Sequence, residues 1–174
     1  MAGPNAGHIR TSFSATLLTV SEGKTEVVEC SSGAGLAQDG WLVHRADVDA
    51  PLVLHFDYIS HSQDRVLYNI SAGPQTPGYS GARLGMSANG FVGLYQVAAV
   101  SDFWKVQLVS AENMPGMFDF MLRDHRGHVV KSHVKRFRRG SLWTGSTHLS
   151  PWHEVNYLSV ETGEPIVFRA TMLD

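Results

Sequence analysis

An all-β domain is the fold class that this sequence predicts, on three observations. Its apolar residues fall into short runs rich in β-branched and aromatic side chains, as in residues 52–56 and 66–70. Seventeen glycines and seven prolines separate these runs, and strand-length segments bounded by turn residues are typical of β-structure. No window of about twelve residues carries a sustained apolar stripe with helical spacing. The best helix-like segment, residues 97–100, is too short to form a stable helix alone.

Length and composition favour a single domain spanning residues 1–174. Hydrophobic residues make up 43% of the chain and charged residues 17%, which is a globular composition and not a disordered one. Residues 1–8 contain two glycines and a proline, and we expect them to form a flexible tail. The single cysteine, Cys30, excludes an internal disulfide framework and any metal site built from several cysteines.

Two further features bear on where the protein acts. No apolar run approaches the ~20 residues that span a bilayer. The first residues also lack the charged and then apolar pattern of a signal peptide. We therefore expect a cytoplasmic protein, or one secreted by a route that needs no signal peptide.

Three features recur with a period near 50 residues: a glycine followed by apolar residues, a strand candidate before it, and an aromatic strand after it. Because the three markers keep a common register, they predict three copies of one four-strand unit. The aromatic residues of the second and third closing strands are expected in the core. The glycines are Gly40, Gly90 and Gly140, the opening strands 17–20, 67–70 and 118–122, and the closing aromatics Phe56, Trp104 and Trp152.

Three such units resemble the β-trefoil, over residues 13–174. Residues 118–130 look like the opening hairpin of a fascin-like or fibroblast-growth-factor-like unit, which runs apolar strand, polar turn with glycine, apolar strand. Residues 150–155 look like the aromatic strand that closes such a unit. The Gln-x-Trp motif of ricin-type lectin trefoils is absent, which argues against that subfamily. An antiparallel β-sandwich is the structural alternative, because it would show the same strands without threefold repetition.

Basic residues concentrate between residues 123 and 139. Seven of the fourteen Lys and Arg lie there against one acidic residue, Asp124, so the segment carries +6 and the remainder of the chain −8. Arginine favours bidentate oxyanions, so this segment suits sulfate, phosphate or an acidic protein surface, although a solvated loop gives the same pattern. The candidate anion-binding residues are Lys135, Arg136, Arg138 and Arg139.

Two tryptophans are expected to face solvent beside the glycine steps. If Leu42, Val92 and Leu142 point inward, alternation along a strand turns the tryptophans next to them outward. An exposed indole can stack on the C–H face of a sugar while polar neighbours bind its hydroxyls, although edge packing against a loop is the alternative. The candidate carbohydrate-binding residues are Trp41, Trp143, Asp39 and Asn89.

Catalytic and metal-binding patterns are weak by comparison. The Gly-Tyr-Ser-Gly segment at 78–81 resembles the G-x-S-G of chymotrypsin-like proteases, but its histidine would have to be His44 or His55, too close in sequence. It is interpreted as a turn, and Cys30 as a small residue at a strand end. His125 and His128 lie near one turn, but zinc needs further ligands. We therefore expect no enzyme, no cofactor and no metal.

These observations favour a non-enzymatic carbohydrate-binding protein, a lectin, whose partners are glycans. The main competing function is that of an interaction protein that binds an acidic polymer (sulfated glycan, actin or a phospholipid surface) through residues 123–139. The trefoil resemblance implies such partners, because fascin-like trefoils bundle actin and growth-factor trefoils bind heparin. A membrane-active toxin, and a small-ligand carrier or enzyme with a barrel cavity, also fit the pattern. Nucleic acid is not expected as a partner, because a lone basic loop on a mildly acidic protein is a poor footprint. Homo-oligomerisation stays open.

Overall fold

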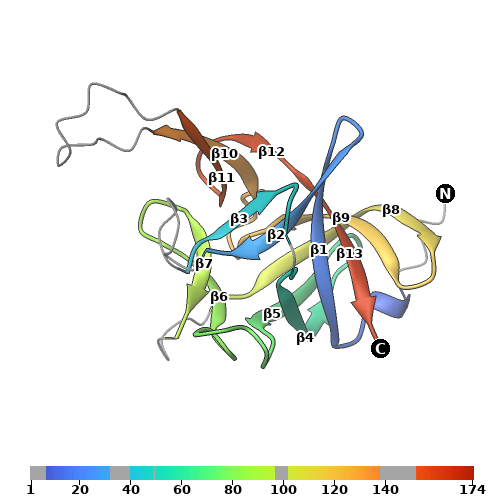
Figure 1. Ribbon diagram of the computed structural model, residues 1–174. Coiled ribbons are helices and arrows are strands. Elements are labelled where there is room, and N and C mark those ends of the chain that lie inside the picture. Colours follow the sequence, from blue (N-terminus) through green and yellow to red (C-terminus); the bar gives the residue numbers. More distant parts are fainter. Residues whose placement is uncertain (1–6, 32–39, 49, 97–101, 138–151) are drawn as a thin grey trace, which may run out of the picture.

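Six antiparallel strands close into a barrel, in the order β1–β4–β5–β8–β9–β13–β1 (Figure 1). The computed structural model describes residues 7–31, 40–48, 50–96, 102–137 and 152–174. The all-β prediction is confirmed, and a closed barrel stands in place of the two facing sheets of the sandwich alternative. The barrel strands are β1 (Phe13–Ser21), β4 (Val53–His61), β5 (Val66–Ala72), β8 (Trp104–Met114), β9 (Met117–Arg123) and β13 (Val167–Leu173).

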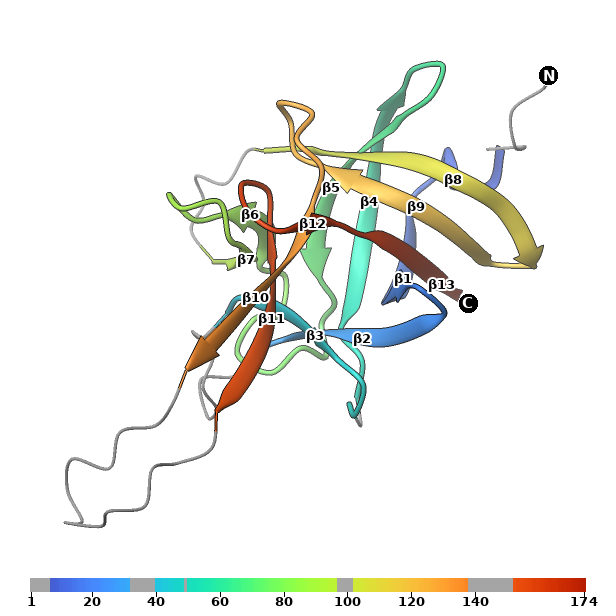
Figure 2. The same cartoon turned by 90° about the horizontal axis from the view of Figure 1, so that it is seen from above.

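Three antiparallel strand pairs lie outside the barrel, each between two barrel strands in sequence. One strand of each pair meets the others: β3 pairs with β11, and two isolated bridges, Trp41 with Gly93 and Phe91 with Ser159, connect β7 to both. Figure 2 shows β10 and β11 extending away from the barrel strands. The pairs are β2 (Lys24–Cys30) with β3 (Leu42–Arg45), β6 (Arg83–Met86) with β7 (Val92–Tyr95), and β10 (Lys131–Phe137) with β11 (His153–Ser159); the short β12 (Glu164–Pro165) pairs with β10.

The glycine steps predicted from the sequence make matching hydrogen bonds in the first two pairs. Gly40 and Gly90 have φ of 84° and 80°, a region that residues with a Cβ rarely occupy. Each glycine N–H donates to a serine carbonyl, that of Ser31 or Ser87, at 2.8 and 2.9 Å. Each of these serine N–H groups in turn donates to the carbonyl of the aromatic residue after the glycine. The third glycine, Gly140, lies outside the described residues.

The core follows the alternation expected of barrel strands. Buried and half-buried positions alternate along β1, β5 and β9, because successive side chains of a strand point to opposite faces. Trp104 is fully buried, as predicted, and Phe56 is fully buried as well. The same prediction is wrong for Trp152, which is 59% exposed. Trp152 precedes β11, which lies outside the barrel, and the barrel strand that follows β11 in sequence is β13, where Phe168 is buried.

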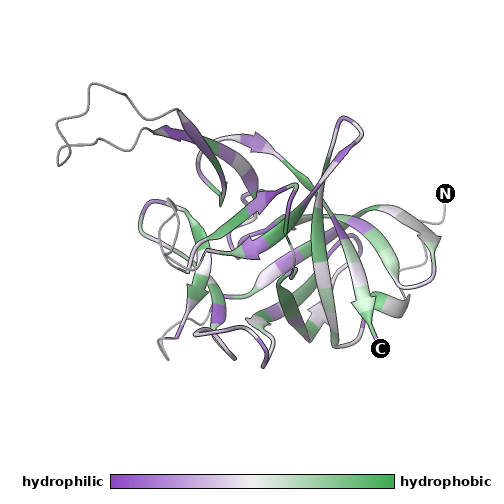
Figure 3. Cartoon of the chain, in the orientation of Figure 1, coloured by the Kyte–Doolittle hydropathy of each residue, from purple (hydrophilic) through white to green (hydrophobic). Residues whose placement is uncertain are grey.

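A short 3₁₀ helix, η1 (Gly7–Ile9), covers one end of the core. Ile9 is fully buried, and its carbonyl accepts a hydrogen bond from the Tyr68 hydroxyl of β5. The end of the segment predicted as a tail is therefore part of a helical turn, and residues 1–6 lie outside the described part. The helix-like segment 97–100 also lies outside it. In Figure 3, hydrophilic residues recur along β10 and β11, the pair that extends furthest from this core.

Candidate functional site

A row of polar side chains crosses the outer strands, and strand register places it. On β10 and β11, Val134 lies opposite Asn156, so Ser132, two residues from Val134, shares that face. On β11 and β3, Asn156 lies opposite His44. Directly opposed residues of an antiparallel pair project from the same face of the sheet. Ser132 and His44 therefore meet on one face, although 88 positions separate them in the sequence.

The same row continues across β3, β2 and β1. His44 lies opposite Val28 of β2, and Glu26, two residues from Val28, shares its face. Glu26 lies opposite Thr19 of β1. A carboxylate and a hydroxyl thus reach the histidine from the side away from Ser132.

These side chains form a continuous chain of hydrogen bonds centred on His44. Its Nε2 lies 2.7 Å from Ser132 Oγ, and its Nδ1 lies 3.0 Å from Glu26 Oε2. Thr19 Oγ1 is a weaker neighbour, at 3.5 Å from the same Nδ1. The His44 side chain is 8% exposed and that of Glu26 22% exposed. Both ring nitrogens of a nearly buried imidazole are therefore held in fixed directions.

The partners of His44 determine where its proton resides. An ionised carboxylate only accepts hydrogen bonds, so the Nδ1–H must donate to Glu26. In the neutral ring Nε2 then carries no proton and accepts the Oγ–H of Ser132. Burial lowers the pKa of His44 from its ordinary 6.5, and the hydrogen bond and charge of Glu26 partly oppose this effect. His44 is therefore neutral near pH 7.

Acidification is expected to destabilise the fold through His44. Because the pKa of His44 is lower in the folded chain, the unfolded chain binds the proton first as pH falls below about 6.5. The free energy of unfolding then decreases until the pH passes the pKa of folded His44. Urea unfolding at about pH 7.5 and 5.5 measures this loss. His44→Gln should lose less stability between these pH values than the parent chain, and equal losses would contradict the assignment.

The hydrogen-bonded chain opens onto a cavity of about 300 Å³. The first outer pair, the third outer pair and the β1–β2 turn all contribute to its walls. Nine of the eleven lining residues carry hydroxyl, carboxylate, amide, imidazole or ammonium groups, and the two apolar residues lie at the end of β12. The lining residues are Thr19, Ser21, Glu22, Lys24, Glu26, His44, Ser132, Asn156, Glu164, Pro165 and Ile166.

Of the sequence-predicted carbohydrate residues, Trp41 and Asn89 are in the described part. Leu42 and Val92 point inward as expected, but the half-buried Trp41 ring stacks on Phe91 at 4.4 Å between centroids. Tyr157 packs against Trp41 in a T-shaped arrangement at 5.4 Å between centroids, so two aromatic rings contact the indole. Asn89 is exposed on the turn before Phe91. The residues outside the described part are Asp39 and Trp143.

Two of the four predicted anion-binding residues are in the described part of the chain. Lys135 and Arg136 are exposed on β10, whereas Arg138 and Arg139 lie outside the described residues. Arg136 Nε lies 2.7 Å from Glu154 Oε1 on the neighbouring strand. The charge of Arg136 is therefore partly neutralised within the pair, and Lys135 is the described cation of this set with no such ion pair.

The histidines of the 124–128 turn face different carboxylates. Asp124, 2% exposed, accepts hydrogen bonds from the backbone N–H of His128 at 2.7 Å and from its Nδ1 at 3.1 Å. His125 Nδ1 instead lies 3.7 Å from Asp102. In the described part of the chain, no three His, Cys, Asp or Glu side chains are grouped to hold a metal ion.

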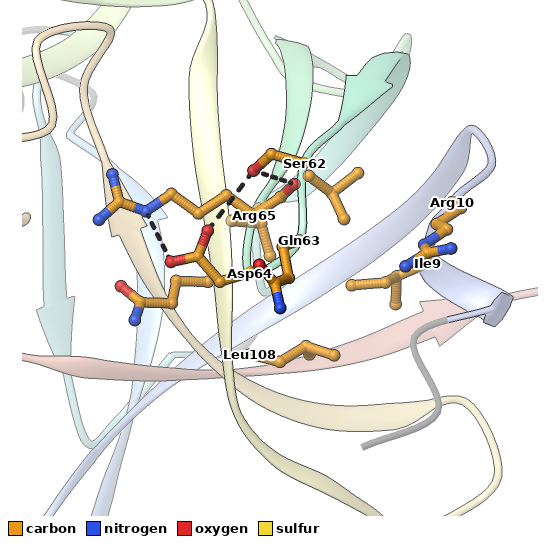
Figure 4. A pocket seen from close by; sticks show the side chains of 10 residues that line it. Ile9, Arg10, Ser62, Gln63, Asp64, Arg65 and Leu108 are labelled. Carbon is orange, nitrogen blue, oxygen red and sulfur yellow. Dashed lines mark hydrogen bonds and ion pairs between the residues drawn. The ribbon is translucent and has the colours of Figure 1, made fainter. Parts of the chain in front are cut away.

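A second cavity, of about 200 Å³, lies beside the β4–β5 turn and η1 (Figure 4). Its polar groups interact locally: Asp64 accepts from Ser62 Oγ at 3.5 Å and lies 3.7 Å from Arg65 Nε. The polar contacts of this cavity are therefore between neighbouring residues of one turn. The cavity brings together no base and nucleophile, and the His44 cavity remains the better candidate.

Sequence reasoning missed Ser132 and Glu26, and it considered His44 only as a partner of the 78–81 segment. That segment forms a turn, as interpreted, and Cys30 ends β2, as predicted. One signal was available: His44 directly follows the apolar run of residues 41–43, and a polar residue that is buried in such a strand needs hydrogen-bond partners. Which partners it has depends on the pairing of distant strands.

A scan against protein-family models, a search of curated proteins and a search of solved structures each found no match to this chain. Within the described residues, no helix has the length and apolar character needed to cross a membrane. The case for function therefore depends on the geometry of the His44 cavity.

Proposed function

We propose that this chain is a β-trefoil protein that binds carbohydrate. The order of elements supports the fold: barrel strand, outer pair and barrel strand follow one another three times, with β13 closing the third unit. The matching hydrogen bonds and positive φ values at Gly40 and Gly90 support a common origin for the first two units. In this arrangement the His44 cavity lies where the first and third units adjoin.

The observation that carries the sugar-binding proposal is the composition of the His44 cavity. Its walls offer hydroxyl, carboxylate, amide and ammonium groups within about 300 Å³, at the lower end of the range of small-ligand sites. Sugars present hydroxyls that such groups bind, and apolar C–H faces that Pro165 and Ile166 can contact. The proposed sugar site is therefore the polar row that lines this cavity, and not Trp41, whose ring is partly covered.

A glycan array followed by titration of the best neutral sugar tests this proposal. Asn156→Ala removes an amide from the cavity wall and should weaken binding by about tenfold, the cost of one or two lost hydrogen bonds. Asn89→Ala, which removes the same amide from an exposed turn outside the cavity, should leave the affinity unchanged. If Asn89→Ala abolishes binding and Asn156→Ala does not, the sugar site lies at the Trp41 end and this cavity is excluded.

Binding of an acidic polymer through β10 is the second candidate. Lys135 is exposed, and the β10–β11 pair extends away from the barrel. Heparin on the same array, at low and high salt, distinguishes the two functions because screening weakens charge-based binding far more than sugar binding by neutral groups. Salt-sensitive binding that is lost when Lys135, Arg136, Arg138 and Arg139 are replaced by alanine would favour this second function.

A further inference from the structure

We propose that Ser132 is a nucleophile activated by His44 and Glu26, and that the His44 cavity hydrolyses carboxylic esters. The substrate class we infer is O-acylated sugars, and this choice rests on the proposed sugar binding. No catalytic residue is required for a lectin, so this activity adds to the proposed function.

The geometry meets the requirements for an activated serine. Ser132 Oγ lies at hydrogen-bonding distance from the ring nitrogen that lacks a proton, and Glu26 holds the opposite nitrogen. A nucleophile, a base and a group that orients the base therefore stand in line, which is the arrangement that activates serine in unrelated folds. Ser132 is half-buried and lines the cavity, so a ligand in the cavity can reach its Oγ.

The reaction proceeds in two balanced steps. Ser132 Oγ attacks the ester carbonyl carbon while its proton passes to His44 Nε2, and the charge of Glu26 stabilises the imidazolium. The bond to the alcohol then breaks, and the alcohol leaves with the proton from His44. In the second step water attacks the acyl-serine, gives a proton to His44, and releases the carboxylic acid as that proton returns to Ser132 Oγ.

The other wall residues determine which ester fits. Lys24 and Asn156 are the nitrogen donors of the cavity besides His44, and they are available to the oxyanion that forms on the carbonyl oxygen. The cavity wall has one ammonium group, that of Lys24, and three carboxylates, those of Glu22, Glu26 and Glu164. Because carboxylates repel anions, neutral acyl esters are favoured over anionic esters such as phosphodiesters.

The test is labelling of the purified full chain with a fluorophosphonate, followed by peptide mass spectrometry. We expect modification at Ser132, and none in Ser132→Ala. His44→Gln and Glu26→Gln should lower the labelling rate and the hydrolysis of p-nitrophenyl acetate by about 100-fold or more. Ser14→Ala is the matched control, because Ser14 Oγ contacts an exposed histidine, His55, at 3.1 Å. It should not change either rate.

The pH profile of p-nitrophenyl acetate hydrolysis gives an independent readout. Activity should fall on acidification, since protonated His44 cannot accept the proton of Ser132. The charged groups that line the cavity with His44 are Lys24 and Glu26 of β2, Glu22 of the β1–β2 turn, and Glu164 of β12. A profile in which activity is unchanged through the titration of His44 would contradict the assignment of His44 as the base.

Labelling and sugar binding are scored separately, so that each proposal has its own outcome. A folded parent chain that is not labelled, or labelling that persists in Ser132→Ala, overturns the nucleophile, even if sugar binds. Labelling at Ser132 in a chain that binds no sugar supports the nucleophile and overturns sugar esters as its substrates. Release of acetate from an acetylated sugar by the parent chain, absent in Ser132→Ala, supports both.

Discussion

Replacement of Gly163 by alanine is expected to destabilise the protein by about 3 kcal/mol or more. Gly163 has φ of 114°, and a Cβ at this position would lie 2.1 Å from the backbone carbonyl oxygen of Ser132. The obstacle is backbone of a strand paired on both sides, which cannot move aside as a flexible side chain can. Urea unfolding of Gly163→Ala gives the change in the free energy of unfolding.

Gly23→Ala is the matched control for this prediction. Gly23 also has a positive φ, 78°, but no atom lies within 4 Å of a Cβ built there. The Gly23→Ala substitution should therefore lower the free energy of unfolding only by its backbone strain, about 1 kcal/mol. If the two alanine variants are equally stable, the close packing of Gly163 on β10 is not a determinant of stability. In a folded Gly163→Ala chain we also expect slower fluorophosphonate labelling, because the displaced carbonyl belongs to Ser132.

Trp104→Ala is expected to cost about 3–5 kcal/mol of the free energy of unfolding. The indole is fully buried in the barrel, and its Nε1–H donates to the Leu84 carbonyl at 3.0 Å. Truncation leaves a cavity and an unsatisfied carbonyl. Trp104→Phe keeps most of the buried area and loses the hydrogen bond, so we expect about 1–2 kcal/mol. Equal costs for the two variants would contradict this division.

Trp152→Ala provides the control of the same residue type. Trp152 is 59% exposed, and its truncation should change stability by about 0.5 kcal/mol or less. Denaturation of all three variants under one condition compares them directly. A cost at Trp152 as large as that at Trp104 would restore the sequence-based expectation that both tryptophans lie in the core.

Local pattern predicted the strands well, because burial on a barrel strand follows a period of two residues. Phe56 and Trp104 are buried, and the positive φ at Gly40 and Gly90 agrees with the glycine steps. Trp152 was wrongly placed in the core because the segment between β9 and β13 is longer than the segments between β1 and β4 and between β5 and β8. Counting 48 residues onward from Trp104 leads to Trp152, ahead of β11, and not to β13, the next barrel strand.

The candidate site was not predictable in the same way. Ser132, His44 and Glu26 lie on three strands, and the hydroxyl is 88 positions from the histidine. Their meeting depends on the register of β10 with β11, β11 with β3, and β3 with β2, and a shift of one residue in any pairing would turn a side chain to the other face. A single sequence contains no direct record of these registers.

The pairing of β1 with β13 has a consequence for how the protein is made. Seven residue pairs, from Ser14 with Leu173 to Val20 with Val167, join strands that stand more than 140 residues apart. Such long-range contacts slow folding, since the chain must lose entropy before they form. During synthesis on the ribosome, β1 and β9 each keep one unpaired edge until β13 emerges. Over that interval their unpaired N–H and C=O groups are exposed to strands of other nascent chains. The protein is therefore most prone to aggregate during translation, before β13 has paired.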